Sequence, residues 1–225
     1  SMKMLNNLLF FFLLISPSIN VISQVSINAG TGFLSGFSSE EPGVFVGFHL
    51  GGEVPRNNDV TFYGRFSHYL NRRGNEYTSP TYLIDFSLHD PITGLPPTTI
   101  NVDSYTLTNM TSIEGGTRYY LGNGFDNGFS IYGGSNMALS FYGVKSRIDD
   151  YDTTLYYPIG DEGKGTIISL SLGLQGGVKY TMPSVGTIYF DITGSYAILA
   201  QANNAIGSST PFYSPLLFGF NIGFR

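Results

Sequence analysis

The sequence predicts an all-β fold: a transmembrane antiparallel up-and-down β-barrel of eight strands, with an extended hairpin between strands 3 and 4. The strongest observation is the last stretch, 216–225, where apolar Leu216, Phe218, Phe220, Ile222 and Phe224 alternate with small or polar residues. Such alternation is typical of a strand with one apolar face. Earlier segments alternate in the same way, and the chain begins with what resembles a secretory leader. A soluble β-sandwich would also alternate, but with its apolar face turned inward.

The composition favours a surface that meets lipid. The 225 residues suit one domain, and charged residues make up only 12% of them, about half the usual share. Glycine and aromatic residues are abundant, with 29 Gly, 18 Phe and 16 Tyr. The net charge of −5 gives no argument for nucleic acid as a partner. The absence of cysteine excludes disulfides, thiolate catalysis and a lipid-modified N-terminal cysteine.

Residues 1–23 are predicted to be a cleaved signal peptide. A short positive region with Lys3 precedes an apolar run over 8–15 and a helix breaker at Pro17. The apolar run is far shorter than the roughly 20 residues that a spanning helix needs. We therefore expect cleavage after Ser23 and a single barrel domain over 24–225.

Eight segments are predicted to be strands, each long enough for the roughly 9–11 residues of a tilted membrane strand: 25–35, 43–54, 59–70, 100–121, 128–146, 164–182, 187–201 and 213–225. The connections between them alternate in length. The short ones are 55–58, 122–127 and 183–186, and the longer, polar ones are 36–42, 71–99, 147–163 and 202–212. This alternation is typical of short periplasmic turns and longer external loops.

The connection 71–99 contains a further strand pattern. Every second residue is apolar or aromatic over the stretch Tyr82, Ile84, Phe86 and Leu88. Turn-forming residues follow this stretch. Because no turn separates 100–108 from 110–121, we predict that 81–89 and 100–108 form a hairpin that continues strands 3 and 4 above the membrane, after an irregular bulge over 71–80. The four apolar residues are the candidate surface for a protein partner.

The charged residues within the predicted strands share one face. Glu53, Arg65, Glu114, Arg118, Lys179 and Asp191 all lie on the small, polar side. A charge facing lipid at mid-bilayer costs about 2–4 kcal/mol, so we expect this side to face the barrel interior. Eight strands leave room only for side chains there. The predicted polar network of the lumen is His49, Glu53, Arg65, Glu114, Arg118, Gln175, Lys179, Asp191 and Asn221; a narrow, gated ion path is the alternative interpretation of the same residues.

Four stretches carry a resemblance to a known family. They are 111–121 (TSIEGGTRYYL), 131–134 (IYGG), 172–180 (LGLQGGVKY) and the C-terminal strand. In this order the chain resembles the small eight-stranded outer-membrane β-barrels of the OmpX and OmpA-transmembrane type, and more closely the porin-like outer-membrane β-barrel family of Bacteroidetes. The resemblance implies the outer membrane of a Gram-negative bacterium. Members of that family include a component of a protein-secretion and gliding machinery. The chain departs from the commonest ending, a terminal Phe, because Arg225 follows Phe224.

No catalytic, cofactor-binding or metal-binding residues are predicted. His49 and Glu53 are four residues apart on one strand face, about 13 Å, which is too far for an acid–base pair. Ser67–His68 and His89–Asp90 lie near the predicted outer rim, but no serine has an identifiable oxyanion loop beside it. The acidic loop 147–163 could hold Ca²⁺, although its spacing does not match an EF-hand. Asp152-Thr153-Thr154 resembles a short O-glycosylation signal, which leaves modification of Thr153 open.

Three functional hypotheses remain. The first is a non-enzymatic barrel with a plugged lumen that is a structural or accessory subunit of an envelope complex, with a secretion-related role as one option. The second is an OmpW-like transport barrel for small or apolar molecules. The third is a lipid-modifying hydrolase at the rim. The expected partners are outer-membrane lipid and a protein of the envelope complex.

Overall fold

The computed structural model describes residues 25–36, 43–74, 77–81, 100–125, 128–148, 163–203 and 214–225. The predicted signal peptide lies outside these residues. The described strands are β1 (Ser26–Gly36), β2 (Val44–Pro55), β3 (Val60–Arg73), β4 (Tyr77–Thr81), β5 (Ile100–Gly122), β6 (Gly128–Ile148), β7 (Lys164–Met182), β8 (Gly186–Asn203) and β9 (Leu216–Phe224). Within these residues, no helix is long and apolar enough to cross a membrane.

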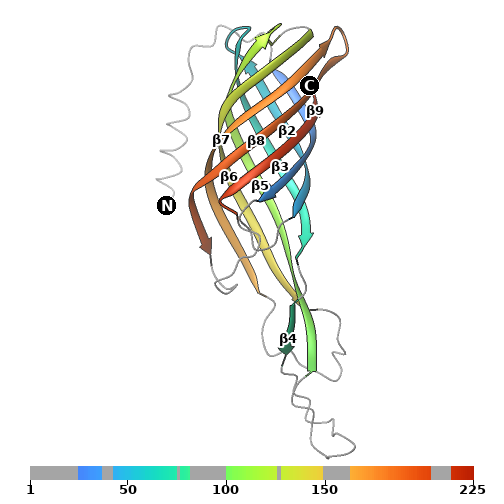
Figure 1. The fold of residues 1–225 in the computed structure, drawn as a ribbon, viewed down its shortest axis with the longest axis vertical. Helices are drawn as coiled ribbons and strands as arrows, with labels where there is room; N and C mark the ends of the chain where they lie inside the picture. Colours follow the sequence, from blue (N-terminus) through green and yellow to red (C-terminus); the bar gives the residue numbers. More distant parts are fainter. Residues whose placement is uncertain are drawn as a thin grey trace, which may run out of the picture.

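The strands form one closed antiparallel sheet (Figure 1). β1 pairs with β2 and β2 with β3, β3 pairs with β5, and from β5 to β9 each strand pairs with the next. β9 pairs with β1 and closes the ring. Because β4 pairs only with the outer end of β5, it is not a member of the ring. The ring therefore has eight strands, and the predicted fold class is confirmed. Predicted and observed ends of the barrel strands differ by at most three residues.

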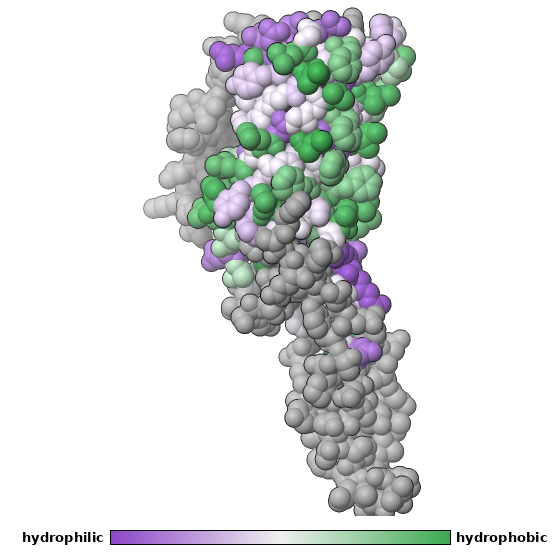
Figure 2. All heavy atoms as spheres, in the orientation of Figure 1, coloured by the Kyte–Doolittle hydropathy of each residue, from purple (hydrophilic) through white to green (hydrophobic). Residues whose placement is uncertain are grey.

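On the side of the barrel that Figure 2 shows, apolar residues predominate below the polar residues at the end with the short turns. Leu50, Phe66, Ile113, Ile192 and Phe220 are each between 44% and 55% exposed. Their sequence neighbours point inward and are buried or half-buried. A band of exposed apolar side chains between polar ends is what a lipid-facing wall requires.

Short turns join the strands at the end of the barrel where the C-terminus lies (Figure 1). In the β2–β3 turn, the Asn57 side chain accepts hydrogen bonds from the backbone N–H groups of Asp59 and Val60, at 3.0 and 2.7 Å. This is the turn chemistry expected of asparagine. In the β7–β8 turn, Ser184 and Gly186 have positive φ angles of 66° and 135°. Glycine adopts such an angle without strain, which suits Gly186 to its position.

The hairpin beyond the barrel is described only at its base. β3 pairs with β5 as far as Arg73 and Leu107, after a register shift between Tyr69 and Arg72. β4 then pairs with residues 100–104, and the two segments project beyond the barrel at the end opposite the C-terminus (Figure 1). The expectation of an irregular segment over 71–80 was wrong in part, because 77–80 continue the ladder. Tyr82, Ile84, Phe86 and Leu88 lie outside the described residues, and the extended hairpin stays a prediction.

Candidate functional site

The interior of the barrel brings the nine predicted lumen residues together. They come from β2, β3, β5, β7, β8 and β9, and all of them except Glu114 are at most 5% exposed. The Glu114 side chain is 11% exposed. The group consists of His49, Glu53, Arg65, Glu114, Arg118, Gln175, Lys179, Asp191 and Asn221.

Asp191 is the central carboxylate of this network. It is fully buried and accepts hydrogen bonds from Arg65 at 3.3 Å, Arg118 at 3.1 Å and the amide of Asn221 at 2.6 Å. β8, which carries Asp191, is four strands away from β3, which carries Arg65, around a ring of eight. The Arg65–Asp191 ion pair therefore crosses the lumen from one wall to the opposite wall.

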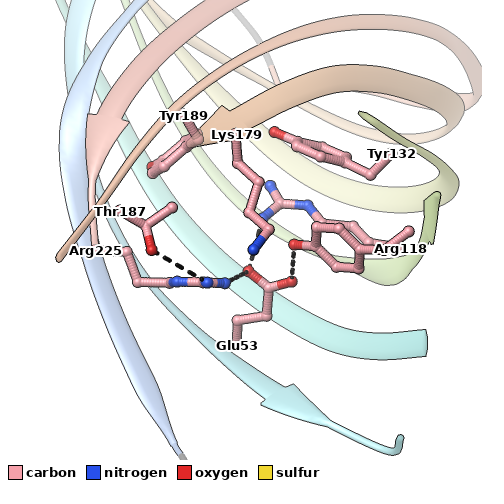
Figure 3. Close-up of a pocket in the computed structure, with 8 residues that line it drawn as sticks. Glu53, Arg118, Tyr132, Lys179, Thr187, Tyr189 and Arg225 are labelled. Carbon is pink, nitrogen blue, oxygen red and sulfur yellow. Dashed lines mark hydrogen bonds and ion pairs between the residues drawn. The ribbon is translucent and has the colours of Figure 1, made fainter. Parts of the chain in front are cut away.

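Glu53 forms a second centre nearer the short turns (Figure 3). One carboxylate oxygen accepts hydrogen bonds from the hydroxyls of Thr61 and Tyr120, both at 2.5 Å. The other accepts hydrogen bonds from Arg118 at 3.0 Å and Arg225 at 3.2 Å. A buried carboxylate with both oxygens satisfied and two cations beside it avoids the penalty of an unpaired buried charge.

Glu114 forms the third centre, toward the long connections. The Arg65 guanidinium donates to both of its oxygens, at 2.9 and 3.1 Å. The hydroxyl of Tyr63 and the amide of Asn136 also donate to it. Arg65 thus joins Glu114 to Asp191 and Arg118 joins Asp191 to Glu53, so the three carboxylates form one continuous network.

Inward tyrosines complete this network and were not among the predicted site residues. Tyr63, Tyr120 and Tyr132 each donate a hydroxyl to one of the three carboxylates. The Arg118 guanidinium lies 4.3 Å from the Tyr63 ring centroid and 4.9 Å from that of Tyr132. Their position on the same strand face as the charges was the signal that could have identified Tyr63 and Tyr120.

Arg225 and Lys179 lie at the end of the lumen near the short turns, where both contact Phe125. Arg225 donates to Glu53 and to the carbonyl of Phe125 at 3.2 Å, and its guanidinium lies 4.0 Å from the Phe125 ring centroid. Lys179 donates to the same carbonyl at 2.8 Å. The six charged residues that the sequence predicts for the lumen are three acids and three bases. The side chain of Arg225 adds a fourth base.

Two further predicted residues, Gln175 and His49, form hydrogen bonds beside the three carboxylates. Gln175 accepts a hydrogen bond from Arg118 Nε at 3.4 Å. His49 Nε2 lies 2.6 Å from the hydroxyl of Tyr189, which donates to Asn28 at 3.2 Å. His49 therefore pairs with tyrosine and not with Glu53.

Glycines on the inner face make room for these side chains. A Cβ at Gly177 would lie 2.5 Å from the Tyr132 ring, and one at Gly223 would lie 2.4 Å from the Tyr189 hydroxyl. Glycine on one strand thus lets a tyrosine from a neighbouring strand cross the interior. Tyr132 and Tyr189 occupy space that side chains at Gly177 and Gly223 would otherwise take.

The half of the interior nearer the long connections contains an apolar cluster, with buried serine and threonine side chains beside it. Its buried cluster is Leu34, Phe45, Tyr69, Met110, Tyr142, Ile167 and Leu217. The sequence did not predict this cluster, because strand alternation indicates which face a residue occupies but not which inward residues meet. The lumen is therefore layered, with ions toward the short turns and apolar side chains toward the long connections.

The described interior contains small cavities. One, of about 10 Å³, lies among Glu53, Arg118, Lys179 and Arg225 (Figure 3). Another, of about 30 Å³, is lined by Arg65, Glu114 and Asn136 among others. Volumes of this size suit one or two water molecules. Arg118 lines the first cavity and Arg65 the second, and both pair with Asp191.

The described residues do not assemble a hydrolytic site from the rim pair. Ser67 points into the lumen and is 3% exposed, whereas His68 lies on the outer face and bonds Thr111 at 2.9 Å. Consecutive residues of a strand point to opposite faces, so these two cannot act together. Among the described residues, no three His, Asp or Glu side chains gather as a metal site. His89–Asp90, the acidic residues 149–162 and Thr153 lie outside the described ranges.

Comparison with known proteins gives structural neighbours only. No protein-family model and no curated protein matches the chain. The chain is similar to Neisserial surface protein A, with a TM-score of 0.52 and 13% identity over 90% of this chain and 97% of that one. A second match is Ail of Yersinia pestis, with a TM-score of 0.47 and 13% identity over 89% of this chain and 96% of that one. A third is the N-terminal β-barrel domain of Pseudomonas aeruginosa OprF, with a TM-score of 0.38 and 13% identity over 89% of this chain and 98% of that one. At such identity the similarity to Neisserial surface protein A shows the fold alone, which is that of the small eight-stranded outer-membrane β-barrels.

Proposed function

We propose that this chain is a non-enzymatic protein of the Gram-negative outer membrane, whose closed barrel is a structural or accessory subunit of an envelope complex. The observation that carries the proposal is the ion pair between Asp191 and Arg65, which joins opposite walls of the lumen. With the Arg118 pairs it forms a plug made of the barrel's own strands.

The outer wall supports the location. Its exposed apolar band fits the hydrocarbon layer, and the polar turns fit the aqueous edges. Closed antiparallel barrels satisfy every backbone hydrogen bond inside a bilayer. By the usual orientation of such barrels, the short turns face the periplasm and the long connections face outward.

The network supports a closed lumen because breaking its buried ion pairs would cost free energy. Removing one partner of a buried ion pair costs about 3–5 kcal/mol, since it leaves an unpaired charge. Arg65 and Arg118 each bind two carboxylates. A passage for solute would have to break several of these pairs at once.

The role in a complex rests on what the barrel projects. β4 and the start of β5 extend beyond the ring, and the candidate partner residues Tyr82, Ile84, Phe86 and Leu88 follow β4 directly in the sequence. A short strand pair at the membrane surface offers backbone edges to which another protein can add a strand. The resemblance to a family with a secretion component makes a secretion-related complex the first assembly to examine.

Planar-bilayer recording tests the closed lumen. We expect the purified chain to show no steady conductance, and the double variant Arg65→Ala/Asp191→Ala to show small currents if it folds. Large, steady currents from the unaltered chain would overturn the proposal. A pull-down from native membranes tests the second half, since a subunit retains a stoichiometric partner.

A transport barrel for small or apolar molecules is the second candidate. The apolar cluster around Tyr142 in the outer half of the lumen favours it, because such a lining would suit an apolar solute. These residues fill the space with their own side chains and are between 1% and 6% exposed. Uptake of an apolar dye into vesicles that hold the protein, above that of empty vesicles, would favour transport over closure.

A further inference from the structure

The cationic side chains of the described chain fall into two main groups. The sequence has 11 Lys and Arg residues, and four of them, Arg65, Arg118, Lys179 and Arg225, belong to the lumen network. Four others face outward at the end with the long connections: Arg73 on β3, Lys145 and Arg147 on β6, and Lys164 on β7. We call these four residues the rim cations. All four are exposed.

The outward direction of the rim cations follows from strand alternation. On β6, Met137 and Leu139 are exposed on the lipid side, and Lys145 and Arg147 continue the same set, while Val144 is buried inside at 2% exposure. On β7, Lys164 shares the face of exposed Ile168, whereas Ile167 is buried.

The sheet register places the rim cations in one line. Arg73 is opposite Leu107 on β5, Leu107 is opposite Lys145, and Lys145 is opposite Lys164. Neighbouring strands are about 4.8 Å apart, so three steps span about 14 Å. Arg147 lies opposite Tyr105, two residues from Leu107 on the same face. The cations of three strands, β3, β6 and β7, therefore lie in one compact patch, with β5 between β3 and β6.

Two contacts within the patch suit an anion. Lys145 and Lys164 are direct cross-strand partners, and like charges in that position are destabilising unless a negative group lies between them. The guanidinium of Arg73 lies 3.8 Å from the Tyr105 ring centroid, which holds it against the wall. Asp103, two positions beyond Tyr105, lies on the same face, and Arg73, Arg147 and Asp103 each take part in another interaction. The need for a bound anion is therefore greatest at the two lysines.

The patch lies just outside the apolar band. On β6 the outward positions run from Phe141 through Gly143 to Lys145, and on β7 from Ile168 through Thr166 to Lys164. Four residues of a strand tilted by about 45° rise about 9 Å along the membrane normal, which reaches the headgroup layer. At the other end of the barrel, the described outward cation is Arg56, in a turn that also contains Asp59.

We propose that the rim cations bind the phosphate-bearing headgroup of a glycolipid in the outer leaflet, while its acyl chains lie on the wall around Leu139 and Ile168. Lysine and arginine are the residues that pair with phosphate. A lipid is favoured over a soluble anion because the cations adjoin the apolar band. This inference rests on the proposed membrane location and orientation.

Native mass spectrometry of the full chain in non-ionic detergent, with lipid A or phosphatidylcholine added, tests the site. We expect the unaltered chain to retain lipid A in preference to phosphatidylcholine. The variant Lys145→Gln/Lys164→Gln should lose that retention by on the order of 10-fold or more. The matched control Arg56→Gln, at the opposite end, should retain lipid A as the unaltered chain does.

Three outcomes would overturn the site: equal retention by the lysine variant, equal retention of dephosphorylated lipid A, or displacement by inorganic phosphate at the lipid's own concentration. The last would identify free phosphate as the ligand. Bilayer recordings and pull-downs test the proposed function separately. Lipid retention in detergent does not depend on a closed lumen or on a protein partner.

The acidic residues of 149–162, which follow Arg147 and precede Lys164 in the sequence, are the rival partner for these cations. The two alternatives differ in stability without lipid. If the acidic loop were the partner, Lys145→Gln/Lys164→Gln would unfold at a lower urea concentration than the unaltered chain when lipid A is absent. We expect the variant to unfold at the same or a higher concentration, since repulsion between the two lysines is removed, and lipid A to stabilise only the unaltered chain.

Discussion

Asp191 and Arg65 contact each other across the full width of the barrel, with an Oδ1–Nη1 distance of 3.3 Å between β8 and β3. They are 126 positions apart in the sequence. Around them, Arg118 and Asn221 satisfy the rest of the carboxylate. A single side chain thus holds together strands that share no backbone pairing.

Replacing Asp191 by Ala should therefore destabilise the barrel strongly. Two arginines would remain buried with one carboxylate fewer, and we expect a loss of about 3–5 kcal/mol in the free energy of unfolding. Urea unfolding in phospholipid vesicles, followed by circular dichroism and by the gel shift of the heat-denatured chain, measures it, because the chain has no Trp to report by fluorescence. Asp59→Ala, in an exposed turn, is the control and should change stability by less than about 0.5 kcal/mol. Equal effects of the two variants would contradict a structural role for the network.

Gly176 and Gly177 offer a matched pair of substitutions. A Cβ at inward Gly177 would meet the Tyr132 ring and the carbonyl of Phe190, both at 2.5 Å, whereas one at outward Gly176 would have its nearest neighbour at 3.8 Å. Gly177→Ala should lower stability by about 1–3 kcal/mol through overpacking. Gly176→Ala should be neutral or stabilise by about 0.4–1 kcal/mol, because it restricts the unfolded chain. The same unfolding assay measures both, and the reverse order would show that the interior is not packed as described.

The alternation of apolar and polar residues predicts the strands and their faces, but not which residues meet inside the barrel. Period-two patterning located the eight strands because lipid-facing and lumen-facing residues alternate in each. It also placed Arg65, Arg118 and Asp191 on the inner face. It could not pair them, because pairing depends on the stagger between strands, which no local pattern contains. For the same reason the sequence did not predict the line of rim cations, which only the register assembles.

Two further features were missed. The apolar cluster of the outer lumen contains Phe45 and Tyr69, which alternate with exposed Val46 and Leu70. Alternation places such residues on the inner face but does not show which inward residues of other strands they meet. Arg225 was not among the predicted lumen residues, yet its side chain turns inward to Glu53. Its hydrogen-bond partners come from other parts of the chain, which a sequence pattern does not show.

Ile192 tests whether the apolar wall faces lipid. It lies near the middle of β8, opposite Phe220 on β9, and is 44% exposed. Ile192→Arg should cost about 2–4 kcal/mol in a bilayer and lower the folding yield in vesicles, whereas in a soluble protein an exposed arginine would be harmless. Leu172→Arg, on β7, should behave alike. Ile192→Val is the control for packing, and normal folding of the Arg variants would contradict a membrane barrel.

The base of the hairpin allows a deletion that spares the ring. The β5–β6 ladder begins at Ser104 and the β3–β5 ladder ends at Arg73 and Leu107, so residues 78–103 contribute no pairing to the ring itself. Replacing 78–103 by a short Asn-Gly turn should leave a barrel that shifts on gels as the unaltered one does. If the hairpin binds the envelope partner, the same variant should no longer bring that partner down from native membranes. Substituting Tyr82, Ile84, Phe86 and Leu88 by Ser in the full chain should have the same effect, because it removes the apolar stripe while keeping the length. A deletion variant that still retains the partner would rule the hairpin out, and one that fails to fold would show that the hairpin is needed by the barrel.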